Sequence, residues 1–150
     1  FPKTWAGKVH FENQKFVPYD PACKVYETKK FHANLEKPLY DGGTVIINMC
    51  IPIAIATGFK EIILLGCDTT YFTSAQLNPY FYDIKEHKTY FNDAEERNKM
   101  WQKNVLQSYE VIQDIIREKG VIIKDATSSG TIQCFEKVSY ESVVKEWNVY

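Results

Sequence analysis

The sequence lacks the long apolar runs and the charge excess that would assign it to several common classes of protein. A membrane-spanning helix needs roughly 20 apolar residues, and the apolar stretch 45–56 is too short and is interrupted by Asn48 and Pro52. The 18 basic and 19 acidic residues leave a net charge of -1. Because binding to bulk nucleic acid demands a basic surface, we expect no nucleic-acid partner.

Closely spaced cysteines are also missing. The four cysteines are far apart in sequence, which excludes a zinc site built from sequence neighbours; they are Cys23, Cys50, Cys67 and Cys134. Cys50 and Cys67 lie in apolar runs, which predicts buried free thiols. Four unpaired cysteines and no visible signal peptide predict a cytoplasmic protein.

What is present is enough for one packed domain. The chain has 150 residues, of which 45% are hydrophobic and 25% charged, values typical of a globular domain with its own core. It begins at Phe1 instead of a methionine. We therefore expect a fragment of a longer protein, and one α/β domain over 1–150.

The first third of the chain has weak periodicity. Prolines and glycine make 1–23 a loop-rich segment with one short strand near 8–11, and 25–35 is expected to contain another strand. The small and apolar residues of 45–57 predict a mostly buried helix that Gly58 ends. Pro52 should kink this helix or loosen one of its turns.

The second half has a stronger pattern. The unbroken apolar run in Glu61–Asp68 predicts a central strand buried on both faces of a parallel sheet. A helix is expected over 94–119, a strand over 121–123 and a short helix over 140–147. This order predicts a right-handed β-α-β unit and an α/β fold, with a Rossmann-like parallel sheet flanked by helices.

Ligands of such sheets bind beyond the carboxyl ends of the strands. Those ends carry Gly66-Cys67-Asp68 and the polar segment 125–130, which we expect to form two walls of a site. Asp68 could hold a ribose hydroxyl or a metal, or it could simply cap the following turn, and the residues alone favour neither. Nothing near Cys67 indicates a reactive thiol, so packing is its expected role.

Two further segments are candidates for chemistry. In Asp41-Gly42-Gly43-Thr44, free backbone N–H groups at a helix start would hold a phosphate, although most such turns bind nothing. The long polar and aromatic segment 69–92 is expected to form a lid loop. Within it, His87 is a candidate general base, although its spacing alone favours an ordinary surface residue; His10 and His32 are further candidates.

A resemblance narrows these alternatives. A glycine turn, a helix of small residues, a Gly-Phe-Lys-Glu-Ile segment and a strand ending in Gly-x-Asp resemble a pattern shared by two related groups of proteins. One is the bacterial sialyltransferases that use CMP-sialic acid, and the other is the motility-accessory-factor family with its hydroxymethylpterin diphosphokinase-like members. The quoted residues are Gly42–Val45 and Ala54–Asp68, with 125–130 and 135–138 resembling a later pattern of the second group.

The resemblance implies a set of nucleotide-binding residues: Gly42, Gly43, Thr44, Gly66 and Asp68. It also implies that Tyr71, with Tyr80 or Tyr82, assists departure of the nucleotide phosphate. His87 would deprotonate the acceptor. Loop length departs from the family pattern here, and the Gly-x-Gly-Pro-Ser turn with which these families begin does not occur in the chain. The chain thus resembles the carboxyl-terminal half, part of a larger domain.

The implied function is transfer of a sugar, with sialic acid as one candidate, from a nucleotide-sugar donor to a cell-surface glycan acceptor. No cofactor and no metal is expected, because tyrosine hydroxyls would stabilise the leaving phosphate. The resemblance also implies a homo-oligomer at the inner face of the membrane. Two alternatives stay open: a pterin diphosphokinase-like phosphotransferase in which Asp68 helps to hold magnesium, and a non-catalytic accessory domain of the same fold.

Overall fold

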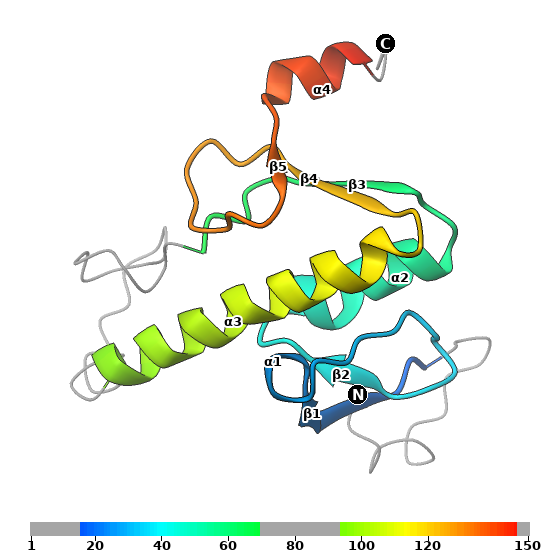
Figure 1. The fold of residues 1–150 in the computed structure, drawn as a ribbon, viewed down its shortest axis with the longest axis vertical. Coiled ribbons are helices and arrows are strands. Elements are labelled where there is room, and N and C mark those ends of the chain that lie inside the picture. Colours follow the sequence, from blue (N-terminus) through cyan, green and yellow to red (C-terminus); the bar gives the residue numbers. More distant parts are fainter. Residues whose placement is uncertain (1–15, 70–93, 147–150) are drawn as a thin grey trace.

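The computed structural model describes residues 16–69 and 94–146. Four layers follow one another in Figure 1: a small sheet, a layer of helices, a second sheet and a terminal helix. In chain order the elements are β1 (Tyr19–Lys24), α1 (Val25–Thr28), β2 (Leu39–Asp41), the π-helical turn η2 (Ile46–Cys50), α2 (Ile51–Ala56), β3 (Glu61–Leu64), α3 (Ala94–Arg117), β4 (Ile122–Asp125), β5 (Glu136–Lys137) and α4 (Tyr140–Glu146).

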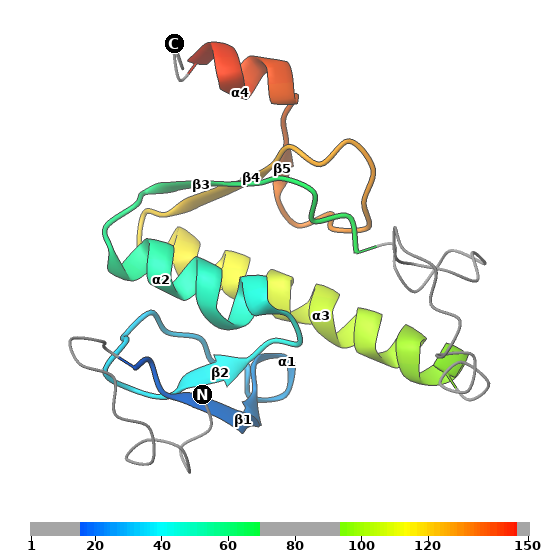
Figure 2. The same ribbon diagram turned by 180° about the vertical axis from the view of Figure 1, so that it is seen from behind.

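The predicted β-α-β unit is confirmed. Strands β3 and β4 pair in parallel from Glu61 opposite Ile122 to Leu64 opposite Asp125, and α3 precedes β4 in the chain. Strand β5 adds to the other side of β4, also in parallel. The chain is therefore of mixed α/β type, with small parallel sheets and flanking helices (Figures 1 and 2).

The prediction that 61–68 is a central strand buried on both faces is wrong. Strand β3 ends at Leu64, and Leu65 is 60% exposed. Within residues 16–69 and 94–146, β3 pairs only with β4 and so lies at the edge of its sheet. Leu64 is buried, whereas Ile122 of β4 is 55% exposed. Only one face of this sheet lies against the layer of α2 and α3, and α4 lies beyond the other (Figure 2).

The predicted helix over 45–57 is present, and Pro52 loosens it as expected. The Ile51 N–H bonds to the Ile46 carbonyl, five residues back, which defines the wide turn η2 just before the proline. Because Pro52 has no N–H, this stretch cannot continue as an unbroken α-helical ladder. Gly58, with φ of 97°, then ends the helix as predicted.

Both main helices end in the same way. At Gly58 the N–H of the next residue, Phe59, bonds to Ala54 O at 3.1 Å, and at Gly120 the N–H of Val121 bonds to Ile116 O at 3.2 Å. Six-residue hydrogen bonds of this kind around a left-handed residue are Schellman motifs. Each of these turns leads directly into a parallel strand.

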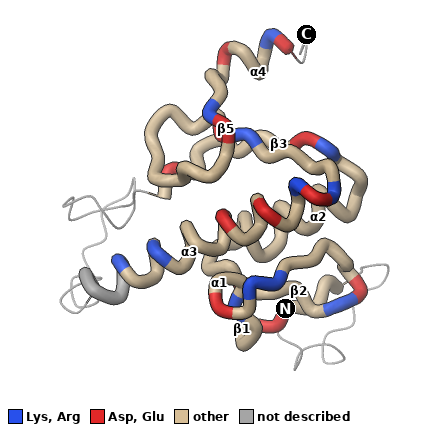
Figure 3. The backbone as a smooth tube through the Cα atoms, viewed as in Figure 1, with Lys and Arg blue, Asp and Glu red and all other residues tan. Residues whose placement is uncertain are grey.

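Helix α3 contributes more residues to the core than any other single element. The apolar residues that recur along it at helical spacing are buried, except that Trp101 is 37% exposed. These residues pack against η2, α2 and the inner face of the β3–β4 sheet; the core includes Val105, Tyr109, Ile112 and Ile116 of α3 with Ile47, Ile51, Leu64 and Ile123. Residues of both charge signs are interspersed along the described elements (Figure 3).

The first third of the chain departs most from expectation. The prediction of a strand within 25–35 is wrong. Residues Val25–Thr28 form one helical turn instead, and Lys29 ends this turn with φ of 54°. Strands β1 and β2 form a two-stranded parallel sheet instead. Pro21 in β1 weakened the sequence signal, yet proline is tolerated in edge strands, and both strands of a two-stranded sheet are edges. The strand expected near 8–11 lies outside the described residues.

The prediction of unpaired cysteines is confirmed, since all four are free thiols. The prediction that Cys50 is buried is wrong, because it lies on the exposed side of η2; Cys67 is half-buried. Among the described residues, no helix is both long enough and apolar enough to cross a membrane.

Candidate functional site

Three segments were predicted to bind a ligand. One of them lies against helix α3, and the other two continue from the carboxyl ends of β3 and β4. The segments are the turn 41–44, which leads into η2, and the loops that follow β3 and β4. In parallel sheets the carboxyl ends of neighbouring strands meet at one edge. We call residues Gly66–Thr69 and Thr127–Thr131 together the strand-end site, and Asp41–Thr44 the Asp41 turn.

Direct hydrogen bonds hold the two loops of the strand-end site together. Thr127 Oγ1 accepts from the Cys67 N–H at 3.0 Å. The Thr131 N–H donates to the Asp68 carbonyl at 3.0 Å. Gly130 packs so closely that an added Cβ would lie 3.1 Å from the Asp68 carbonyl oxygen. The expectation that these two strand ends lie side by side is confirmed.

Thr69 has a strained backbone. Its φ is 52°, a left-handed conformation that is unfavourable for a β-branched residue. Its hydroxyl lies 2.5 Å from the hydroxyl of Thr131. Gln102, a buried residue of α3, donates from Nε2 to the Thr69 carbonyl at 3.2 Å and to Thr131 Oγ1 at 3.4 Å. Three residues from three segments thus fix this left-handed turn.

Asp125 lies beneath the site as a fully buried carboxylate. Its Oδ1 accepts from the Thr127 N–H at 2.8 Å, and its Oδ2 from Lys137 Nζ at 2.5 Å. Burial by itself raises the pKa of this carboxyl, but the bonds from Lys137 and Thr127 outweigh it and hold the pKa below its usual value. Asp125 is therefore an ionised structural support for the loop that follows β4.

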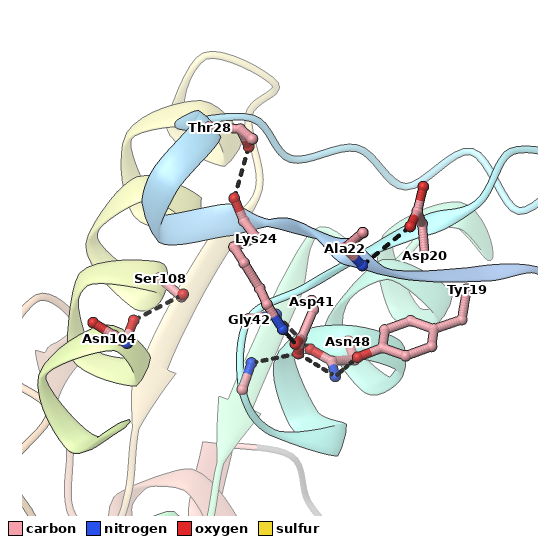
Figure 4. Close-up of polar contacts among 11 residues, drawn as sticks. Tyr19, Asp20, Ala22, Lys24, Thr28, Asp41, Gly42, Asn48, Asn104 and Ser108 are labelled. Carbon is pink, nitrogen blue, oxygen red and sulfur yellow. Dashed lines mark hydrogen bonds and ion pairs between the residues drawn. The ribbon is translucent and has the colours of Figure 1, made fainter. Parts of the chain in front are cut away.

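The Asp41 turn has a network of its own, drawn in Figure 4. Asp41 Oδ1 accepts from the Gly43 N–H at 2.9 Å and from Asn48 Nδ2 at 3.1 Å, and Lys24 Nζ donates to Oδ2. Asn48 Oδ1 accepts from the Gly42 N–H at 2.6 Å. Both glycine N–H groups, which were expected to be free for a phosphate, are thus bonded within the chain.

The same network accounts for the ionisation of its members. Burial opposes the charge on Asp41, but bonds from Lys24, Gly43 and Asn48 outweigh it and lower the pKa of the carboxyl. Burial and the neighbouring Asp41 raise the pKa of the Tyr19 hydroxyl. The carboxylate of Asp41 therefore occupies the position that an external anion would take at this turn.

Helix α3 connects the Asp41 turn to the strand-end site. A Cβ on Gly43 would lie 2.7 Å from Val105 Cγ2 and 3.5 Å from Trp101 Nε1. One position along the helix from Trp101, Gln102 reaches the strand-end site. Thr44 Oγ1 accepts from the Ile47 N–H at 3.3 Å, a side-chain bond of the kind that caps the start of a helix.

The structure places the other predicted residues as follows. Asp68 is exposed, and its side chain forms no hydrogen bond with another residue of 16–69 or 94–146. His32 is bonded on both ring nitrogens, to the Asn34 N–H and to the Pro38 carbonyl, so it is a structural residue. Burial raises the pKa of Cys67, which supports a packing role for this thiol. Tyr71, Tyr80, Tyr82, His87 and His10 lie outside the described residues, as does the lid loop beyond Thr69.

Sequence reasoning missed several residues that hold these segments: Lys24, Asn48, Gln102, Thr131 and Lys137. One signal was available for Asn48, since a polar side chain inside an otherwise apolar helix needs a partner. No local signal marks Gln102, because its partners are 33 and 29 residues away. Among the described residues, no group of three or more His, Cys, Asp or Glu side chains could hold a metal ion.

Comparison with known proteins adds no neighbour: no family model, no curated protein and no solved structure matches this chain.

Proposed function

We propose that this chain contributes the nucleotide-binding part of a glycosyltransferase, in which a nucleotide-sugar donor binds at the strand-end site. The observation that carries the proposal is the joining of the loops after β3 and β4 at one edge of a parallel sheet. This edge is where open α/β sheets bind nucleotides. The residue pattern around Gly58–Asp68, which resembles the bacterial sialyltransferases, supplies the donor class.

The chemistry of the site suits such a ligand. Asp68, Ser128 and Ser129 are exposed there, and a carboxylate beside hydroxyl groups can bond to the hydroxyls of a ribose. Within residues 16–69 and 94–146 the N–H groups of Ser128 and Ser129 have no recorded acceptor. By contrast, a phosphate at the Asp41 turn would have to displace Asp41 or Asn48. We therefore assign the nucleotide to the strand-end site and a supporting role to the turn.

The proposed reaction is a displacement at the anomeric carbon of the donor. An acceptor hydroxyl oxygen forms a bond to that carbon while the bond to the phosphate oxygen breaks, and the phosphate leaves with the electron pair. His87 would take the acceptor proton, and Tyr71 and Tyr82 would donate hydrogen bonds to the departing phosphate. These three residues lie outside the described part of the chain, so their roles depend on the resemblance.

Calorimetric titration with CMP and with a CMP-linked sugar tests the proposal. We expect saturable binding of both, weakened about tenfold by Asp68→Asn, as expected for loss of one charge-assisted hydrogen bond. The matched control is Asp114→Asn, which changes an exposed acid on α3 and should bind like the unchanged protein.

Absence of binding by the unchanged protein would overturn the proposal and favour an accessory domain. Binding of a nucleotide diphosphate or triphosphate only in the presence of Mg²⁺ would overturn it in favour of phosphotransfer.

A further inference from the structure

Gln102 has the environment of a residue that organises a site. Its side chain is 9% exposed, and a buried amide that lacked partners would be destabilising. It comes from the first half of α3, whereas its two partners follow β3 and β4. A single side chain therefore contacts both loops of the strand-end site.

The contacts fall where the backbone is least favourable. Thr69 has φ of 52°, which is costly for a threonine and persists only where surrounding contacts impose it. Gln102 Nε2 donates to the carbonyl of this residue at 3.2 Å. The second contact, to Thr131 Oγ1 at 3.4 Å, reaches the residue whose N–H is bonded to the Asp68 carbonyl. The amide thus holds the peptide group after Thr69 directly, and the peptide group between Asp68 and Thr69 through Thr131.

We propose that Gln102 is a positioning residue of the strand-end site, whose amide holds the loops after β3 and β4 in the arrangement that binds the nucleotide. It does not itself contact the nucleotide. This inference rests on the proposed function for its ligand, but the coupling of the two loops is a property of the protein alone. It can therefore be tested without any ligand.

Gln102→Glu is the decisive variant because it makes the contact depend on pH. An ionised carboxylate only accepts hydrogen bonds and would face the Thr69 carbonyl without a proton, whereas a protonated carboxyl can donate one. Burial favours the protonated form. At neutral pH the two loops should separate in this variant, and lowering the pH should restore the contact between them. A variant that was merely misfolded would not recover this contact. Gln102→Met keeps the volume and loses the donor at every pH.

Amide hydrogen exchange measured by NMR gives the readout without ligand. In Gln102→Met we expect the Thr131 N–H to exchange on the order of tenfold faster at all pH values, after correction for intrinsic exchange. In Gln102→Glu we expect the same increase only at the higher pH values. The Ile122 N–H, which donates to the Lys60 carbonyl at 2.9 Å at the far end of the same sheet, should be unaffected. Gln107→Glu, on the same helix, is the matched control and should exchange like the unchanged protein at each pH.

CMP affinity is then measured for the same set of variants. The affinity of each variant is divided by the affinity of the unchanged protein at the same pH. This ratio removes any pH dependence that all the variants share, including the titration of CMP itself. We expect Gln102→Met to bind about tenfold more weakly and Gln102→Glu to recover as the pH falls. Normal Thr131 protection in both Gln102 variants would overturn the inference. Faster exchange together with no CMP binding by the unchanged protein would overturn the proposed function and leave the loop coupling standing.

Discussion

The Asp41 turn and the strand-end site use similar residues in opposite ways. At the turn, Asp41, Asn48 and the two glycine N–H groups are bonded to one another and to Lys24. At the strand-end site, Asp68, Ser128 and Ser129 remain exposed and Thr69 is held in a strained conformation. A polar network that satisfies itself stabilises a fold, whereas exposed polar groups on a fixed support can bind a ligand.

Each region also has an ion pair between directly opposed residues of parallel strands. Lys24 of β1 is opposite Asp41 of β2, and Asp125 of β4 is opposite Lys137 of β5. The two pairs differ in burial and in the number of other donors. Asp125 is completely buried, whereas the side chain of Asp41 is 14% exposed and accepts further bonds from Gly43 and Asn48. The loss of the lysine should therefore affect the two regions differently.

The largest effect is expected for Lys137→Met. It leaves the buried Asp125 carboxylate without its countercharge. Because the side chain of Lys137 is itself 41% exposed, the cost should be about 3 kcal/mol, at the lower end of the range for a fully buried pair. Urea unfolding at neutral pH measures this loss. The exposed Lys103 of α3 provides the control, because Lys103→Met should change the free energy of unfolding by less than about 0.5 kcal/mol. Equal values for the two variants would show that Asp125 does not depend on Lys137.

Gly42→Ala should come next. The added Cβ would lie 1.9 Å from Ile47 Cγ2, so the turn or the helix must shift, at a cost of about 1 to 3 kcal/mol. Gly58→Ala is the matched comparison, since no atom lies within 4 Å of its Cβ position and only its φ of 97° is unfavourable. That conformational cost is about 1 kcal/mol. If Gly58→Ala were the more damaging of the two, the close packing assigned to the Asp41 turn would be wrong.

Lys24→Met should have a smaller effect than Lys137→Met. Asp41 keeps its bonds from Gly43 and Asn48 and has some access to water, so the loss should be about 1 to 2 kcal/mol, typical of one charge-assisted hydrogen bond. Thermal and urea unfolding of both lysine variants under one condition measure the difference. A loss at Lys24 that matched the loss at Lys137 would remove the distinction between the two pairs.

The weakest effect is expected in the pH dependence of stability. Both Asp41 and Asp125 have a lowered pKa in the folded protein. Their contribution is therefore complete above the unfolded value of about 3.9 and is lost as the pH falls through the folded values. In Asp41→Asn the unfolding free energy should fall less steeply below about pH 4 than in the unchanged protein. An identical slope would show that Asp41 does not contribute to acid sensitivity.

Much of the second half of the chain was predictable, because its signals are local. The apolar period of α3 and the left-handed glycines at positions 58 and 120 act within a few residues of themselves. The convergence of Gly66–Asp68 with 125–130 also followed from the order of elements, since parallel strands bring their carboxyl ends together. The burial of β3 was predicted wrongly, because an apolar run does not reveal whether a second neighbouring strand is present.

The sequence by itself determined the parallel β-α-β unit, the ends of its helices and the edge of the sheet at which polar loops gather. Only the tertiary structure decided that Lys24 of β1 bonds to the Asp41 turn and that Gln102 joins the two strand-end loops. These hydrogen bonds join residues that are far apart in sequence: Lys24 and Asp41 are separated by 17 positions, and Thr69 and Gln102 by 33. Such contacts leave no trace in residue periodicity, because they form only once the packed core has brought distant segments within hydrogen-bond reach.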